Sequence, residues 1–327
     1  MKRLGVLGSM VWDRIHARDG TDAVVEEWGG LAYALAAAAA ACPPEWEIVP
    51  IVKVGRDLED RARRFFNNLP NFAIGPGVKP VAEPNNRVEL RYVDQNRRVE
   101  QMSGGVPPWT WPELEPIVRN LDGLYVNFLS GFEMNLETAQ AMRAGYTGTI
   151  YADLHSIFLG IDPDGVRWPR PLDSWREWLR CFDIIQVNEE ELGLLAFAFG
   201  DPWQFAAQVV CDEPRCIFVT LGARGAAYIA SEWYGAGPLS WRRQRVIPPS
   251  IVRPGRVITR KFEPPQGALD GDPTGCGDVW GATCCCALFG GASLDDAMRQ
   301  ALDAATINVQ HRGATGLYER LIGRVAA

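Results

Sequence analysis

One glycine-rich segment, directly before an apolar helix, contains the residue types needed to hold an anion and to move a proton. It runs Gly271-Asp-Pro-Thr-Gly-Cys-Gly-Asp278 and is followed by the apolar stretch from Val279 to Leu288. Gly275 and Gly277 allow the backbone to approach a ligand closely, and a helix start offers unpaired N–H groups and a positive dipole end. The segment is therefore typical of an anion-binding site.

Asp278 decides what such a site would do. A carboxylate repels a neighbouring anion, so its presence indicates a task other than binding. It could take a proton from a substrate hydroxyl while backbone amides hold developing phosphate charge. The simpler alternative is a glycine turn whose aspartate is favoured by the helix N-terminus. The spacing alone leaves both interpretations open.

This segment and four others, in the same order, resemble a known family. Asp272-Pro-Thr-Gly-Cys-Gly-Asp278 is similar to the D-T-x-G-A-G-D signature of the PfkB (ribokinase-like) family of ATP-dependent sugar and nucleoside kinases. The other four segments are Gly8-Ser-Met-Val-Trp-Asp13, Gly29-Gly30, Asn188-Glu-Glu-Glu191 and Thr220-Leu-Gly-Ala-Arg-Gly225. Each motif is weak by itself, but together they span nearly the whole chain.

The resemblance implies a fold and a reaction. The expected fold is a three-layer α/β/α domain with a largely parallel central sheet, and the expected reaction transfers the γ-phosphoryl group of ATP to a substrate hydroxyl. On matching positions, Asp278 would be the general base, and the amides of Gly275, Cys276 and Gly277 would form the anion hole. A nucleoside kinase of the same family is the alternative activity.

The resemblance also implies residues for the cofactors, which are ATP, Mg²⁺ and a monovalent cation such as K⁺. The expected cofactor-binding residues are Asn188, Glu191, Thr220, Gly222, Gly225 and Asn308. Glu191 would organise Mg²⁺ through water, and Asn308 would lie near the adenine edge. An ordinary helix cap explains Asn188 and Glu191 equally well, Gly225 suits a structural role, and Asn308 suits a helix surface.

Four residues are expected on the acceptor side. Asp13, Gly29 and Gly30 match the sugar site, where a carboxylate accepts hydrogen bonds from hydroxyls. Asp153, at the end of an expected strand, is a weaker candidate. The alternatives are a solvated loop aspartate for Asp13 and a loop cap for Asp153.

The sequence departs from the family pattern at three positions. Ala34 stands where the family has an asparagine that helps to recognise the sugar, so the acceptor cannot be copied from known kinases. This departure supports a competing hypothesis, a non-catalytic ligand-binding or regulatory protein with the same fold. Pro273 and Cys276 replace a threonine and an alanine. A nucleophilic Cys276 thiol is disfavoured because no histidine adjoins it in sequence.

The rest of the chain fits an α/β protein with a lid. Strands are expected at residues 4–8, 48–54, 124–128, 149–152, 184–186 and 217–220. Helices are expected at residues 31–42, 58–69, 136–144, 174–181, 189–199, 202–210, 277–288 and 294–311. Such alternation predicts a largely parallel sheet covered on both faces, with ligands at the carboxyl ends of the strands. Two insertions, at about 12–28 and 83–105, predict a small β lid on this single domain.

Composition excludes several other classes. The formal net charge of −7 argues against a nucleic-acid partner, because such binding depends on clustered Lys and Arg. The eight cysteines contain no C-x-x-C pair, which favours buried thiols and a reducing cytoplasm. The longest apolar run, Leu31 to Cys42, is shorter than the roughly 20 residues of a membrane span. A homodimer through the lid edge is the expected assembly.

Overall fold

The computed structural model describes residues 1–16, 24–92, 98–210, 214–234, 237–243, 256–265 and 271–324. Parts of both expected lid insertions, residues 17–23 and 93–97, lie outside this set. In the described part of the chain, no helix is long and apolar enough to cross a membrane.

A nine-stranded sheet forms the centre of the molecule, in the order β15-β14-β13-β12-β9-β8-β1-β4-β5. Its strands are β1 (Lys2–Leu7), β4 (Trp46–Gly55), β5 (Val78–Val81), β8 (Gly123–Asn127), β9 (Thr149–Asp153), β12 (Ile184–Asn188), β13 (Cys216–Thr220), β14 (Ala226–Ser231) and β15 (Val257–Phe262). From β5 across to β13 all neighbours pair in parallel, and β14 and β15 extend the sheet antiparallel. The carboxyl ends of the parallel strands therefore meet along one edge.

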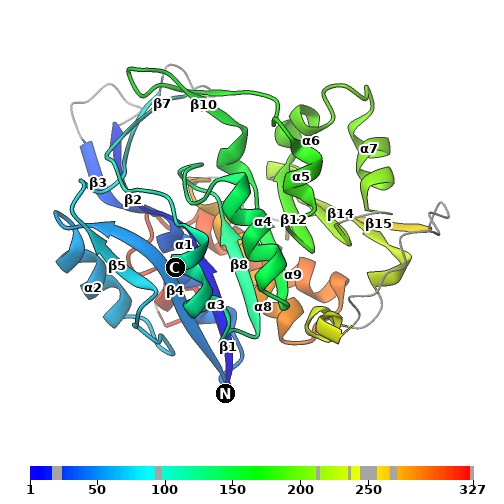
Figure 1. Ribbon diagram of the computed structural model, residues 1–327, viewed down its shortest axis with the longest axis horizontal. Coiled ribbons are helices and arrows are strands. Elements are labelled where there is room, and N and C mark those ends of the chain that lie inside the picture. Colours follow the sequence, from blue (N-terminus) through cyan, green and yellow to red (C-terminus); the bar gives the residue numbers. More distant parts are fainter. Residues whose placement is uncertain are drawn as a thin grey trace.

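Helices cover both faces of this sheet (Figure 1). One apolar core contains side chains of α1 (Leu31–Ala41), α2 (Glu59–Asn67), α8 (Cys276–Phe289), α9 (Leu294–Val309) and α10 (Leu317–Leu321). The other contains side chains of α3 (Trp111–Val118), α4 (Leu136–Gly145), α5 (Trp175–Leu179), α6 (Glu189–Leu195) and α7 (Pro202–Val209). The expected three-layer α/β/α class is confirmed.

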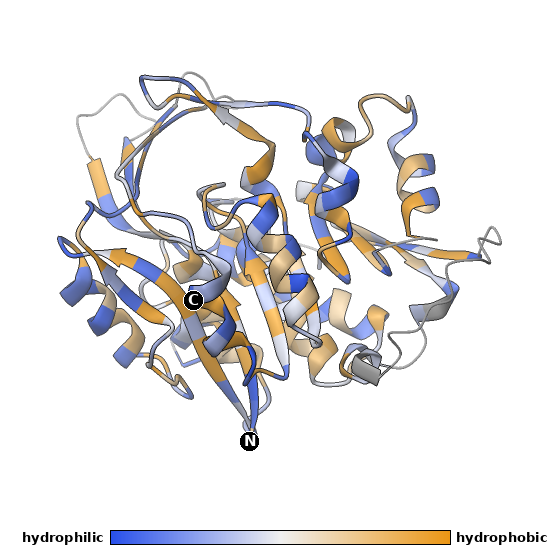
Figure 2. Ribbon diagram, in the orientation of Figure 1, coloured by the Kyte–Doolittle hydropathy of each residue, from blue (hydrophilic) through white to orange (hydrophobic). Residues whose placement is uncertain are grey.

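The central strands are apolar because helices cover both of their sides. Figure 2 shows hydrophobic residues along these strands, whereas the outer helices mix hydrophobic and hydrophilic positions. Helix α8 is apolar over most of its length because it packs against both α1 and α9, and Cys284, Cys285 and Cys286 are buried within it. This packing fixes the start of α8, where Asp278 lies, relative to the sheet.

A second sheet lies over the edge where the parallel strands end. It contains β2 (Met10–His16), β3 (Val24–Gly30), β6 (Arg87–Tyr92) and β7 (Arg98–Ser103) in the order β3-β2-β6-β7. We call this sheet the lid. Its strands carry a small apolar core of their own, made of Val11, Ile15, Val88, Leu90 and Met102.

A short hairpin, absent from the sequence prediction, extends the lid. Its strands are β10 (Leu159–Ile161) and β11 (Arg167–Pro169). The Met102 amide on β7 donates to the Gly165 carbonyl in the hairpin turn at 2.8 Å, and Gln101 bridges to Val166. Since the hairpin occupies part of the β7 edge, the dimer expected through the lid has β3 as its remaining edge; that assembly stays a prediction.

Candidate active site

A cavity of about 810 Å³ lies between the lid and the carboxyl ends of the central strands. Three neighbouring parallel strands end there, and their last residues, Asp153, Asn188 and Thr220, all line it. Gly275, Cys276, Gly277 and Asp278 reach it from the start of α8, and Asp13 and Gly30 reach it from the lid. The fold thus brings most of the predicted site residues together, although they are far apart in sequence.

The segment that leads into the first turn of α8, residues 271–277, is the anion loop. Gly275 is the N-cap of α8 and has a φ of 76°. A Cβ at Gly275 would lie 2.4 Å from Cδ1 of Tyr33, so this position needs glycine for both its conformation and its space. The N–H of Gly277 belongs to the first turn of the helix, where amides have no intrahelical acceptor. The Cys276 amide instead donates to the Pro273 carbonyl at 3.1 Å, so it contributes less to the anion hole than predicted.

Asn308, on α9, holds the anion loop through a buried hydrogen bond. Its side chain is fully buried, and its Nδ2 donates to the Thr274 carbonyl at 2.9 Å and lies 3.3 Å from the Cys276 Sγ. Asn308 itself does not line the described cavity, although Ala305, Thr306 and Val309 of the same helix do, so its expected place near the adenine edge stays a prediction. Burial raises the pKa of the Cys276 thiol to about 11, which disfavours a nucleophilic thiolate at neutral pH.

Asp278 lies on the first turn of α8 and is held by a partner from the central sheet. Asn127, the last residue of β8, is fully buried, and its Nδ2 donates to Oδ1 of Asp278 at 2.8 Å. Burial raises the pKa of Asp278 to about 6, while the Asn127 hydrogen bond and the positive charge of His155 oppose that rise. A carboxylate with a raised pKa, fixed in orientation and facing a cavity, has the properties of a general base.

A buried chain of hydrogen bonds connects Asp153 to α8. Nε2 of Gln186 donates to Oδ2 of Asp153 at 2.8 Å and to the Gly277 carbonyl at 3.0 Å, and the Tyr151 hydroxyl donates to Oε1 of Gln186 at 3.0 Å. Burial, together with the nearby Glu191 and Asp278 charges, raises the pKa of Asp153. Asp153 thus combines a buried support role with a place in the cavity wall.

Asn188 and Glu191 form a reciprocal cap at the start of α6. The Glu191 amide donates to Oδ1 of Asn188 at 2.8 Å, and the Asn188 amide donates to Oε2 of Glu191 at 2.8 Å. Nδ2 of Asn188 also donates to Oε1 of Glu191 at 2.7 Å. The helix-cap interpretation of this motif therefore holds, and both residues also line the cavity.

His155 is a cavity residue that the sequence prediction missed. Its Nδ1 lies 2.5 Å from Oε1 of Glu191. Burial alone would lower the pKa of His155, but the charge and hydrogen bond of Glu191 raise it to about 9. Among the described residues, no group of three or more His, Cys, Asp or Glu side chains is arranged to hold a metal ion directly.

The acceptor side of the cavity is built by the lid and α1. A Cβ at Gly29 would lie 1.7 Å from Oδ2 of Asp13, so glycine at this position makes room for the carboxylate rather than for a ligand, and Gly29 is not part of the described cavity lining. Asp13 is 7% exposed. Ala34 is fully buried, whereas its neighbour Tyr33 lines the cavity.

The opposite end of the cavity has an apolar wall. Thr220 ends β13, and Gly222 and Gly225 follow it in a turn in which the Leu221 amide donates to the Gly225 carbonyl at 2.8 Å. Apolar side chains of α9 also line this end: Leu302, Ala305 and Val309. The anion loop contacts both sides: Gly275 lies beside Tyr33 of α1, while Cys276 and Thr274 contact Ala305 and Asn308 of α9.

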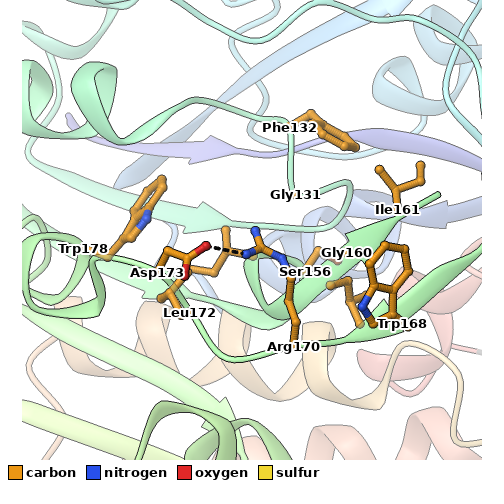
Figure 3. Close-up of a pocket in the computed structure, with 12 residues that line it drawn as sticks. Gly131, Phe132, Ser156, Gly160, Ile161, Trp168, Arg170, Leu172, Asp173 and Trp178 are labelled. Carbon is orange, nitrogen blue, oxygen red and sulfur yellow. Dashed lines mark hydrogen bonds and ion pairs between the residues drawn. The ribbon is translucent and has the colours of Figure 1, made fainter. Parts of the chain in front are cut away.

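A separate pocket of about 450 Å³ lies beside the hairpin (Figure 3). Its wall includes the exposed side chains of Phe132, Ile161 and Trp168, and Arg170 forms an ion pair with Asp173 at 2.9 Å. None of the predicted site residues lies in this pocket.

The site thus consists of a lid over the carboxyl edge of a three-layer sheet and a glycine loop that leads into a carboxylate on a helix. No family model matches the chain. A curated relative, the ribokinase of Arabidopsis thaliana, is 26% identical over 223 residues, which cover 64% of this chain and 48% of that protein. The chain thus spans about half the length of that relative.

Solved structures match almost the whole chain. A sulfate complex of a pyrophosphate-dependent kinase in the ribokinase family has a TM-score of 0.71 at 16% identity and covers 95% of this chain and 96% of its own. Arabidopsis thaliana ribokinase complexed with ribose and ATP has a TM-score of 0.67 at 20% identity, with 98% and 99% covered. The chain has the ribokinase-like fold, and the predicted resemblance to the PfkB (ribokinase-like) kinases is confirmed.

Proposed function

We propose that this protein is an ATP-dependent kinase that phosphorylates a hydroxyl of a sugar or sugar-like small molecule. Asp278 takes the proton from the attacking hydroxyl, and the amides of the anion loop hold the charge on the transferring phosphoryl group. The observation that carries this proposal is the position of Asp278. It is fixed by Asn127 beside the anion loop, in a setting that raises its pKa to about 6.

The shape of the cavity supports ATP as the donor. The apolar wall from Leu302, Ala305 and Val309 lies past the anion loop and suits an adenine ring. Pyrophosphate is the donor named for three of the structural neighbours, and it has no apolar group that could pack against this wall. Comparing the activity of this protein with ATP and with pyrophosphate therefore tests the proposal directly.

Magnesium would reach this site with the phosphates of the donor. Mg²⁺ commonly keeps several waters and binds through one or two carboxylates plus substrate phosphates. Glu191 fits such a water-mediated role because it lines the cavity. Its carboxylate also contacts His155 and accepts the Asn188 amide in the α6 cap. When bound, the ion would neutralise charge on the phosphates.

The experiment measures product release from ATP or pyrophosphate with Mg²⁺ and pooled sugars, sugar acids, sugar phosphates and nucleosides. We expect one pool to raise ADP release, and Asp278→Asn to lower that turnover on the order of 10²- to 10⁴-fold. Asp60→Asn, on the exposed face of α2, is the matched control and should keep full activity. ATP binding without turnover of any pool would instead favour a ligand-binding protein that kept the fold.

A further inference from the structure

One half-buried cation in the acceptor side of the cavity has no role in the mechanism above. Arg167 is the first residue of β11 and lies under the lid, where it lines the cavity together with Asp13, Leu90 and Glu100. Among the described residues that line the cavity, the cationic side chains are Arg167 and His155. Because His155 is paired with Glu191, the charge of Arg167 needs a separate explanation.

The guanidinium of Arg167 is held by main-chain oxygens. Its Nη1 donates to the Leu129 carbonyl and its Nη2 to the Ser130 carbonyl, both at 3.3 Å. These are long hydrogen bonds, and a guanidinium has five N–H donors, so most of its donor capacity is left over. Within the described part of the chain, Arg167 forms no ion pair with a carboxylate.

Two acidic residues, Glu133 and Glu100, act on this guanidinium through their charge. Glu133 is buried, and its carboxylate accepts hydrogen bonds from the amides of Leu129, Ser130 and Gly131. Glu100, on β7, lines the same cavity, and its charge raises the pKa of Arg167. Burial lowers the pKa of Arg167 in spite of both charges, as expected for a cation whose desolvation is poorly compensated.

We infer that Arg167 binds an anionic group, a carboxylate or a phosphate, on the acceptor molecule. On this inference, which rests on the proposed kinase function, the acceptor is a sugar acid or a sugar phosphate. A guanidinium offers two parallel N–H donors that match the two oxygens of either group.

The position of Arg167 relative to the base fits one small acceptor. Asn127 holds Asp278, and Leu129, whose carbonyl holds Arg167, follows Asn127 by two residues. Two residues of extended chain span at most about 7 Å, and Asp278 and Arg167 line the same cavity. A single small molecule in this cavity can place its reacting hydroxyl at Asp278 and its anionic group at Arg167.

The alternative is that Arg167 only fastens the loop after β8. In that case its removal would weaken the binding of charged and neutral acceptors equally. An anion-binding role predicts a loss confined to the anionic compounds. The two interpretations therefore differ in a quantity that can be measured without any turnover.

The test is calorimetric binding without a donor, using matched sets: glucose, gluconate and glucose 6-phosphate; fructose and fructose 6-phosphate; ribose, ribonate and ribose 5-phosphate. The variants are Arg167→Met, which removes the charge, and Arg167→Lys, which keeps the charge but not the paired donors. Arg170→Met is the control, since Arg170 lies in the separate pocket and pairs with Asp173 (Figure 3).

We expect at least one anionic compound to bind more tightly than its neutral partner. Arg167→Met should weaken that compound on the order of 10- to 100-fold and leave the neutral partner unchanged, as for the loss of a hydrogen bond to a charged group. Arg167→Lys should lie in between, and Arg170→Met should match the wild type. Comparing the acid with the phosphate shows which anion the site takes.

The inference is overturned if no anionic compound binds better than its neutral partner, or if the preference persists in Arg167→Met. The kinase proposal fails separately. Arg167-dependent binding without ADP formation would leave the anion site standing and refute the kinase. Phosphorylation of a neutral sugar, with no phosphorylation or tighter binding of the related acid or phosphate, would support the kinase and refute the anion site.

Discussion

Replacing the proposed base should make the unliganded protein more stable at neutral and alkaline pH. Asp278 has a pKa raised from 3.8 to about 6 by burial. Between these two values the folded state binds a proton more readily than the unfolded state, so the stability contributed by this group falls as pH rises through about 6. Asp278→Asn removes the ionisation but keeps an oxygen for the Asn127 donor.

The size of the effect follows from the shift. One pKa unit corresponds to 1.36 kcal/mol, so a shift of about two units gives at most about 3 kcal/mol above pH 7. Since the Asp278 side chain is partly exposed, we expect a gain of about 1–3 kcal/mol at pH 8. The gain should fall to about half at pH 5, where the folded-state carboxyl is already largely protonated.

Thermal unfolding of the ligand-free protein at pH 8 and pH 5 measures this difference. For a chain of this size, about 1–3 kcal/mol corresponds to a rise in Tm of roughly 2–6 °C. Asp60→Asn should change the Tm only slightly, and equally at both pH values, because this exposed carboxylate in the first turn of α2 is ionised at both. The reasoning is refuted if Asp278→Asn is no more stable than the wild type at pH 8, or if its gain is the same at both pH values.

Two further variants test the anion loop. Gly275→Ala should destabilise the protein by about 1–3 kcal/mol and reduce turnover, because the residue has a φ of 76° and its Cβ would lie 2.4 Å from Tyr33; a melting curve unchanged from the wild type would contradict this. Asn308→Ala should lower stability by about 1–3 kcal/mol, because the Thr274 carbonyl loses its buried donor. In initial-rate kinetics, Asn308→Ala should also raise the KM for ATP more than the KM for the acceptor. Equal changes in both KM values would argue against a role of Asn308 at the anion loop.

The fold was largely predictable because its central strands and most of its helices have strong apolar patterns. Elements with weak patterns were missed. Helix α3 begins with Trp111-Pro112 and contains Pro116. Prolines usually indicate a turn, so no helix was predicted here, although Pro112 lies in the first turn, where proline is favourable. The hairpin strands β10 and β11 have three residues each, too few for any period to be visible. Helix α6 ends at Leu195, earlier than expected.

The candidate site was predictable where residues stand in sequence motifs, and unpredictable where tertiary packing supplies them. Asn127 and Gln186 are polar residues at or near the ends of apolar strands, a signal that could have been used together with Asp153. Nothing near His155 in sequence indicates its contact with Glu191. The full burial of Asn308 was not predictable, because helical spacing does not show which neighbouring segment will cover a given face.

The measurement that tests the central claim most directly is the pH dependence of kcat/KM for the acceptor, with the wild type and Asp278→Asn compared from pH 5 to pH 8. Because the base must be ionised and burial raises its pKa to about 6, activity should rise with pH and level off above about 7, with an apparent pKa near 6. The residual activity of Asp278→Asn should lack this rise. A wild-type profile that is flat across this range, or a rise that persists unchanged in the variant, would contradict the assignment of Asp278 as the base.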